Sequence, residues 1–294
     1  MLQSKFVKLE DRGILAVVGP DRRVFLQGLV SNDVEKVSGE RACYAALLTA
    51  QGKYLHDFIM TEHEDAIWLE VEMARLADLK RRLSIYRLRA KVTLDERPDL
   101  AVIAVFGGAV AAALGLPEEP GAGRSLAGGV AFIDPRLAAL GGRCVLPRNA
   151  APQALAEAGL AAGDFAEYDR LRLVLGVPDG SRDLVLDKSI LLEAGFDELN
   201  GVDWQKGCYI GQELTARTKY RGLIKKRLFP VRIEGPAPAP GTILMQGGRE
   251  AGEMRSSRDD IGLALLRLDA ADQASQAGDA CLAPITPDWM RLPV

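Results

Sequence analysis

The segment 206–213, which reads Lys-Gly-Cys-Tyr-Ile-Gly-Gln-Glu, contains the residue types best suited to chemistry in this chain. Its two glycines permit tight backbone turns, and residues 212–220 contain no helix breaker, so a helix is predicted there. Cys208 would then lie near a helix N-terminus beside Lys206, where the helix dipole and the ammonium favour a thiolate. The segment therefore predicts a reactive cysteine. The alternative is a small buried apolar residue, as free cysteines usually are.

Two clusters of basic residues are suited to an anionic ligand. Seven lysines and arginines, Arg217 and Arg221 among them, occur between residues 217 and 232. They are enough to bind the charged tail of a ligand or a phosphate backbone. A second cluster, between residues 80 and 91, contains six. Either cluster can instead be a solvated face, and the two focus charge on one cleft only if they meet in space.

The scaffold that positions these residues is predicted to mix helices with strands. Apolar alternation and turn residues predict strands at 6–10, 14–18, 42–49, 54–60, 66–71, 87–94, 130–133 and 143–146, the first two joined as a hairpin. Apolar residues at helical spacing predict helices from residue 21, over 72–83 and over 164–175. Since hairpins join several strands directly, an α+β fold with antiparallel sheets is favoured over a doubly wound parallel sheet.

A proline-rich stretch at residues 235–241 can form neither a helix nor the interior of a sheet. The short apolar runs that follow it predict a small all-β module. We therefore divide the chain into a first α+β unit at 1–100, a second at 101–230 that can intertwine with the first, and the C-terminal module at 231–294.

Composition excludes several classes of protein. Of the 294 residues 48% are hydrophobic and 26% are charged, which is typical of a globular protein and not of a disordered or fibrous one. The net charge of −3 disfavours non-specific coating of nucleic acid. The N-terminal residues resemble neither a signal nor a transit peptide, and no apolar stretch reaches the roughly 20 residues of a membrane span. A cytoplasmic protein without membrane contact is predicted.

The four cysteines are too widely spaced in the sequence to form a metal-binding motif. Cys43, Cys144, Cys208 and Cys281 are separated by 101, 64 and 73 residues, and the chain has only two histidines. Without a Cys-x-x-C pair, no metal site is expected within the chain. An iron–sulfur cluster, which normally takes four thiolates, cannot be held by Cys208 alone, but this residue could supply one ligand to a shared cluster.

The segment 206–213 resembles the signature of the YgfZ family, folate-binding relatives of the glycine-cleavage T-protein that serve iron–sulfur cluster assembly. The similarity continues over 215–218 and 226–230, which also resemble the mitochondrial branch of that family. Weaker blocks occur in the family's order at 25–28, 31–33, 52–57, 172–178 and 192–195, so the resemblance covers essentially the whole chain. It implies a T-protein-like architecture of two ferredoxin-like α+β units around a central opening, followed by a small β-barrel.

The resemblance also implies tetrahydrofolate, or a derivative, in that opening. Glu193 matches the family position whose carboxylate pairs with the pterin, and a carboxylate can accept the two parallel donors of a pterin ring. The alternative for Glu193 is an acid favoured by the dipole in the first turn of a helix. Lys206, Arg217 and Arg221 are the candidates for binding the rest of the anionic cofactor.

Asp57 matches the T-protein aspartate that stands beside the reacting folate nitrogens. It lies on the predicted strand 54–60 and shares a face with apolar residues, where a carboxylate needs a partner or a raised pKa. Asp57 is therefore a candidate catalytic residue together with Cys208, or else a structurally paired acid. His56 lies on the other face of the strand, and we expect it at the surface.

Three functions are compatible with these residues. The resemblance implies a folate-binding factor that supports assembly or repair of iron–sulfur enzymes, with assembly proteins or client enzymes as partners and tRNA modification among the associated processes. The alternative is a tetrahydrofolate-dependent aminomethyl transferase, although T-proteins lack the cysteine signature. The third is RNA binding through the basic segment 217–232, for which the sequence shows no known RNA-binding motif.

Overall fold

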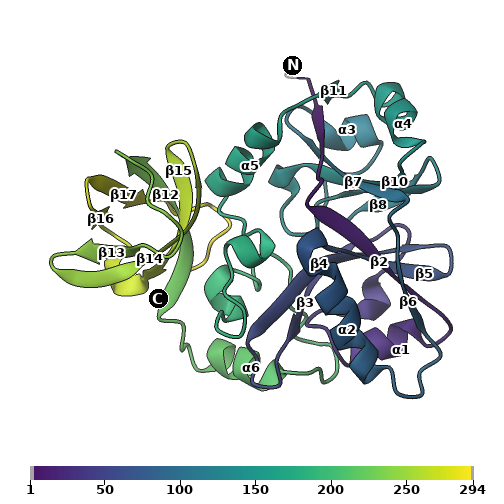
Figure 1. Ribbon diagram of the computed structural model, residues 1–294, viewed down its shortest axis with the longest axis horizontal. Coiled ribbons are helices and arrows are strands. Elements are labelled where there is room, and N and C mark those ends of the chain that lie inside the picture. The colour runs from purple at the N-terminus through teal and green to yellow at the C-terminus, as the bar shows by residue number, and fades with distance from the viewer. Residues whose placement is uncertain (1–2, 293–294) are drawn as a thin grey trace. The chain divides into compact units, whose positions relative to one another are not determined.

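The computed structural model describes residues 3–292 of the chain (Figure 1). They form two compact units, each built from several separate segments. Unit 1 consists of residues 3–48, His56–Tyr168 and Leu199–Ile210, and unit 2 of Thr49–Leu55, Asp169–Glu198 and residues 211–292. The chain therefore passes between the units several times.

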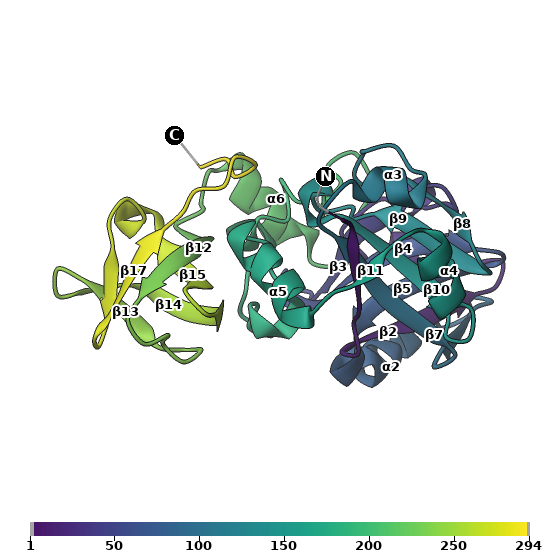
Figure 2. The ribbon, with the colours of Figure 1, turned by 90° about the horizontal axis from the view of Figure 1, so that it is seen from above.

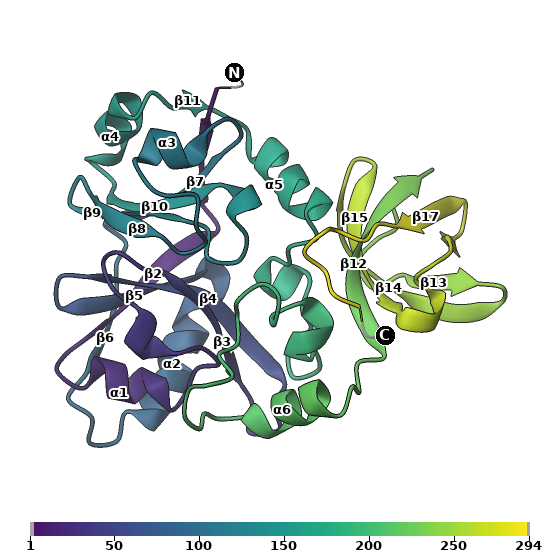
Figure 3. The ribbon, with the colours of Figure 1, turned by 180° about the vertical axis from the view of Figure 1, so that it is seen from behind.

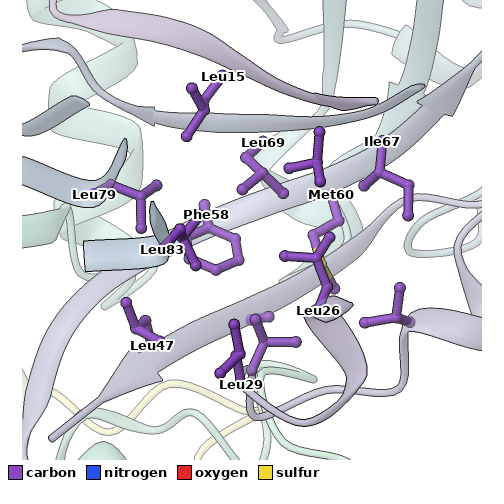
Figure 4. Close-up of a cluster of buried hydrophobic side chains, with 14 of the residues drawn as sticks. Leu15, Leu26, Leu29, Leu47, Phe58, Met60, Ile67, Leu69, Leu79 and Leu83 are labelled. Carbon is purple, nitrogen blue, oxygen red and sulfur yellow. The ribbon is translucent and has the colours of Figure 1, made fainter. Parts of the chain in front are cut away.

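The first sheet has five described strands in the order β3-β4-β5-β2-β6. The strands are β2 (Arg12–Val18), β3 (Cys43–Leu48), β4 (Tyr54–His63), β5 (Ala66–Glu72) and β6 (Thr93–Glu96). Helices α1 (Arg22–Gln27) and α2 (Leu76–Tyr86) pack on one face of this sheet (Figures 1 and 3). Figure 4 shows Leu79 and Leu83 of α2 gathered with Phe58 of β4 and Leu26 of α1 in one apolar cluster. Each such buried side chain contributes about 1.5–3 kcal/mol, which fixes the helices on the sheet.

Most of the elements predicted for this region are confirmed. The strands predicted at 42–49, 54–60 and 66–71 are β3, β4 and β5, and the helices predicted from residue 21 and over 72–83 are α1 and α2. The strand predicted at 87–94 is wrong in its first part, because α2 continues to Tyr86 and the chain turns before β6. The alternating residues there are exposed cations, and they mark no buried face of a sheet.

The second sheet, also in unit 1, has six described strands in the order β11-β1-β7-β10-β9-β8. The strands are β1 (Lys5–Lys8), β7 (Leu100–Phe106), β8 (Gly123–Leu126), β9 (Gly129–Ile133), β10 (Gly142–Pro147) and β11 (Ala161–Ala162). Side chains from α3 (Val110–Leu114) and α4 (Ala151–Glu157) complete its apolar core. The strands predicted at 130–133 and 143–146 are confirmed as β9 and β10.

The hairpin predicted from residues 6–10 and 14–18 is wrong. β1 pairs with β7 and β11, whereas β2 pairs with β5 and β6, so the two neighbouring strands belong to different sheets. Gly13, which separates the two predicted strands, lies inside β2, where a Cβ would be 2.8 Å from the Met73 Cε. The glycine therefore serves close packing, and local apolar alternation could not show which strand each segment joins.

Helix α5 (Phe165–Val174) confirms the helix predicted at 164–175, but its buried side is only partly apolar. Among its apolar residues Tyr168 is buried, but Val174 is 44% exposed. Asp169 and Arg172 are also buried. Asp169 accepts hydrogen bonds from Arg172, Arg182 and Arg258 at 2.7–3.0 Å. These charged residues can occupy the buried side because they satisfy one another, and apolar spacing alone cannot detect such a face.

The C-terminal strands close into a barrel in the order β12-β15-β14-β13-β16-β17, which confirms the predicted all-β module (Figures 1 and 2). The strands are β12 (Lys226–Glu234), β13 (Ile243–Gln246), β14 (Arg249–Arg258), β15 (Ile261–Arg267), β16 (Ser275–Ala277) and β17 (Ala280–Pro284). Phe229, Val231, Met254 and Leu266 lie in its core. The proline-rich stretch connects β12 to β13. β12 was not predicted because it begins with basic residues and contains Pro230, features that argue against a strand interior.

The remaining helices are short. They are α6 (Gln212–Tyr220), which confirms the helix predicted there, and the 3₁₀ turns η1 (Val34–Lys36), η2 (Met73–Arg75), η3 (Ala138–Leu140), η4 (Gly180–Arg182), η5 (Leu191–Ala194) and η6 (Leu268–Ala270). Within residues 3–292, the helices are all too short or too polar to cross a membrane.

Candidate functional site

The cysteine predicted to be reactive lies in an exposed loop of unit 1. Cys208 is exposed, whereas Cys43 and Cys144 are buried and Cys281 is half-buried. Burial raises the pKa of Cys43 to about 11 and that of Cys144 to about 12, so both remain thiols at neutral pH. Of the four cysteines, Cys208 is the one most open to another molecule.

The loop of Cys208 precedes α6, whose N-cap is Gly211. Cys208 therefore lies three residues before the N-cap. Because the effect of a helix dipole falls off within about one turn, this position is at the limit of its influence. Activation of the thiol by the helix stays a prediction, while its exposure is a feature of the structure.

Lys206 fastens this loop to the segment that follows α1. Its ammonium donates hydrogen bonds to three backbone carbonyl oxygens, those of Gln27 at 2.8 Å, Val30 at 2.6 Å and Asn32 at 2.8 Å. An ammonium has three donors, so these bonds use all of them. Burial lowers the pKa of Lys206 to about 8. This geometry gives Lys206 a positioning role, and its role in holding a cofactor stays a prediction.

Further polar contacts hold the segment 200–210 in place. Ser31 Oγ donates to the carbonyl oxygen of Gly201 at 2.6 Å, and Asn32 Nδ2 donates to that of Asn200 at 2.7 Å. The carboxylate of Asp203 accepts from the Lys206 backbone N–H at 3.0 Å. The block 31–33, noted in the sequence as part of the resemblance, therefore supports the cysteine loop structurally.

Replacing Lys206 by methionine should loosen this loop. The substitution keeps an apolar side chain but leaves three carbonyl groups without their donor, which should lower the free energy of unfolding by about 1–3 kcal/mol. Hydrogen exchange of residues 200–210 should become faster than in the wild type. Lys225→Met, which changes an exposed lysine, is the matched control and should alter neither quantity. Unchanged exchange in Lys206→Met would show that the carbonyl contacts do not hold the loop.

Asp57, the second predicted catalytic residue, is buried on β4. Its Oδ2 accepts a hydrogen bond from the Tyr44 hydroxyl at 2.9 Å, and Tyr44 lies on the neighbouring strand β3. Burial, helped by the charge of Asp57, holds the pKa of Tyr44 well above its usual value, so the hydroxyl remains a donor. Asp57 is thus a paired acid, and its catalytic role stays a prediction.

His56 was expected at the surface, and this prediction is wrong. The residue is 1% exposed, and its Nε2 lies 3.0 Å from Asp78 Oδ2 on α2. Burial lowers the pKa of His56 to about 4, so the ring is neutral at physiological pH and its Nε2–H donates to the carboxylate. His56 lies on the same face of β4 as Phe58 and Met60. From the sequence we assigned this face to solvent, but α2 covers it.

Glu193, the residue expected to bind the pterin, lies in η5 of unit 2. It is half-buried, and among the described residues its carboxylate has no hydrogen bond or ion pair. Burial raises the pKa of Glu193, while the positive charges of Lys53, Lys226 and Arg255 oppose that shift. A partly buried carboxylate without a partner is a candidate acceptor for donor groups of a ligand.

Of the three cations near Glu193, Lys226 belongs to the basic cluster identified in the sequence, whereas Arg255 was not identified as part of a site. Lys53 lies in the turn before β4, Lys226 begins β12, and Arg255 lies on β14, a strand that was not predicted. Lys53 follows the Gly52 noted in the resemblance, and this glycine with φ +79° lets the turn approach α6 closely. The block 52–57, together with the blocks 192–195 and 226–230, pointed to this region in the sequence.

Arg217 and Arg221 are exposed, one on α6 and the other at its end. They lie one helical turn apart, and α6 packs against η5, which carries Glu193. The structure thus brings the predicted Glu193, Arg217 and Arg221 into unit 2, while Cys208, Lys206 and Asp57 belong to unit 1. Over residues 3–292, no three His, Cys, Asp or Glu side chains gather in a metal-binding arrangement.

Comparison of the whole chain with solved structures defines the class of fold. The aminomethyltransferase T of the glycine cleavage system from Bartonella henselae superposes with a TM-score of 0.78 and 16% sequence identity, covering 98% of this chain and 86% of that one. Residues 225–292 match the family described as CAF17, C-terminal beta-barrel domain. The predicted T-protein-like α+β fold with a C-terminal barrel is therefore confirmed.

Sequence relatives then show the family. The human iron–sulfur cluster assembly factor IBA57, mitochondrial, is 38% identical over 307 residues, which cover 96% of this chain and 84% of that protein. The mouse protein of the same name is 36% identical over 309 residues, with the same coverage. The chain belongs to the IBA57 family of iron–sulfur cluster assembly factors. This family is more specific than the YgfZ grouping that the motif predicted.

The predicted cytoplasmic location is wrong by this comparison. The human and mouse relatives, and one from Neurospora crassa that is 32% identical over 251 residues, are all named mitochondrial proteins. The prediction rested on an N-terminal segment that resembles neither a signal nor a transit peptide and on the lack of a stretch long enough to span a membrane. The names of these relatives overturn it.

Proposed function

We propose that this chain assists iron–sulfur cluster assembly by supplying the thiolate of Cys208 to a cluster shared with a partner protein. The observation that carries the proposal is the exposure of Cys208 on a loop held by Lys206. The names of the relatives support the assembly role. The thiol loses its proton when it binds iron. Cys208 is the one exposed cysteine, since Cys43 and Cys144 are buried and Cys281 is half-buried, and the other ligands of the cluster come from the partner.

We further propose that tetrahydrofolate or a derivative binds at Glu193. The carboxylate fits the ring N–H and amino group of a pterin, because it is partly buried and has no partner among the described residues. Lys53, Lys226 and Arg255 supply positive charge near it, and Arg217 and Arg221 lie on the helix packed against η5. When bound, tetrahydrofolate supplies a carrier of one-carbon units.

A tetrahydrofolate-dependent transferase is the second candidate. The buried pair of Asp57 and Tyr44 favours it, since a fixed carboxylate can act as acid or base on a bound amine. Turnover of a small amine with formation of methylenetetrahydrofolate would support this candidate. Its absence together with folate binding would support the assembly factor.

Titration calorimetry with tetrahydrofolate tests the folate proposal. The wild-type chain should bind, and Glu193→Gln should weaken binding by about tenfold or more, because the amide accepts one pterin donor but presents its own N–H₂ to the other. The matched control Asp272→Asn removes a negative charge from an exposed turn of the barrel and should bind as tightly as the wild type. Absence of heat at millimolar ligand in the wild type would refute the folate proposal, and equal affinities would remove Glu193 from it.

A further inference from the structure

A basic and apolar surface at the C-terminal end of α2 has no part in the function proposed above. We call it the α2 surface. It comprises Lys80, Arg81, Ile85, Tyr86, Arg87, Leu88, Arg89 and Lys91. Three of its large apolar side chains are exposed, Ile85 at 63%, Tyr86 at 42% and Leu88 at 88%. Exposed apolar side chains gathered in one place are typical of an interaction surface.

The backbone holds Leu88 outward in an unusual conformation. Its φ of +41° lies in the left-handed region, which residues other than glycine rarely adopt. Hydrogen bonds fix the turn on both sides, from Arg87 N–H to the Ser84 oxygen at 3.3 Å and from Lys91 N–H to Asp21 Oδ2 at 2.7 Å. The turn therefore presents an apolar side chain to solvent from a defined position.

The charges around Leu88 are positive and unmatched. Arg87, Arg89 and Lys91 are exposed, and within the described part of the chain their side chains form no ion pair. Lys80, by contrast, pairs with Glu96 at 3.0 Å. The whole chain carries a net charge of −3, so the charge of this surface is opposite in sign to that of the chain as a whole. The positive charge of this surface favours a partner that carries carboxylates.

Two grooves border this segment. One of about 570 Å³ lies between α2 and β6 and is lined by Ala77, Lys80, Arg81, Ser84, Ile85 and Glu96. A second of about 440 Å³ is lined by Leu88 and its neighbours together with Val18 and Gly19. Each combines apolar and basic lining residues. Such grooves can bind a segment that carries both apolar side chains and carboxylates.

We propose that the α2 surface docks an acidic segment of a partner protein that also carries apolar side chains. Its carboxylates pair with Arg87, Arg89 and Lys91, and its apolar side chains contact Ile85 and Leu88 and enter the grooves. Each groove has room for more than one side chain of such a segment. Three exposed apolar residues give too little apolar area for stable insertion into a lipid surface. The proposal requires neither folate nor Cys208, so it stands or fails separately from the proposed function.

Fluorescence anisotropy with two labelled peptides tests this proposal. One peptide alternates blocks of Glu and Leu, and the other has Ser in place of Leu. The Glu–Leu peptide should bind the full chain at least tenfold more tightly than the Glu–Ser peptide. Leu88→Ser should remove most of this difference, and Arg87→Glu combined with Arg89→Glu should abolish binding of both. The double control Arg249→Glu with Arg291→Glu reverses two exposed cations, one on β14 and one in the segment after β17, and should leave binding unchanged.

Several outcomes would overturn the proposal. These are equal binding of the two peptides, binding unaffected by Leu88→Ser, or binding weakened equally by both double variants. Anionic phosphatidylserine vesicles and a single-stranded RNA are tested in parallel with the same variants. If the Arg87 and Arg89 reversals abolish binding to vesicles or RNA while the peptides do not bind, the surface belongs to that other partner. Circular dichroism melting of each variant confirms that it is folded.

Discussion

Replacement of Arg172 by methionine is expected to lower the free energy of unfolding by about 3–5 kcal/mol, because it removes one partner of a buried ionic network. Arg172 lies on α5 with its side chain 4% exposed. Its Nε donates to Asp169 Oδ1 at 2.7 Å, one terminal nitrogen donates to Asp183 Oδ2 at 2.7 Å and the other to Ser256 Oγ at 3.1 Å. Methionine fills similar space without any donor. The substitution thus leaves two buried carboxylates with one cation fewer.

The neighbouring Arg170 provides a matched control. It is also on α5, but it forms an exposed ion pair with Asp260. Exposed pairs contribute about 0–1 kcal/mol, so Arg170→Met should have a small effect. Urea denaturation of both variants measures the difference. If Arg172→Met unfolded at the same urea concentration as Arg170→Met, the network would not be the link between α5 and β14 that the structure indicates.

The sequence predicts local elements well and their long-range partners poorly. β3, β4 and α2 follow from apolar spacing within each segment, which depends on residues close in the chain. The pairing of β1 with β7 depends on residues about a hundred positions apart. The interleaving of the two units likewise depends on contacts between residues far apart in the chain.

The candidate site also depends on long-range contacts that the sequence did not predict. The segment 206–213 identified Cys208, and its exposure agrees with the reactive alternative. The sequence placed the Lys206 ammonium beside the thiol, whereas the structure directs it to carbonyl oxygens near α1. No local pattern could reveal these acceptors, because backbone carbonyls carry no residue signature. His56 was misplaced for a related reason, since its cover comes from α2.

The second large effect is expected for Cys208→Ser. This variant should no longer support the activity of iron–sulfur enzymes, although the chain stays folded. Serine has nearly the same size, and the residue is exposed, so stability should change by less than about 0.5 kcal/mol. The hydroxyl is a far poorer ligand for iron than a thiolate. Function should therefore be lost while the melting temperature is retained.

Cys281→Ser is the matched control, since it changes a half-buried cysteine of the barrel that has no proposed ligand role. Alkylation of the wild type followed by mass spectrometry should label Cys208 before Cys43 and Cys144, because burial keeps those two out of reach. Slow labelling of Cys208 would show that its thiol is not available in solution.

The most direct test of the central claim is the specific activity of iron–sulfur enzymes in a strain that lacks this chain. The strain receives the wild type, Cys208→Ser or Cys281→Ser, and immunoblots confirm equal amounts of each protein. The wild type and Cys281→Ser should restore enzyme activity, while Cys208→Ser should leave it at the level of the empty vector. Full restoration by Cys208→Ser at an equal protein level would contradict the role of Cys208 as a cluster ligand.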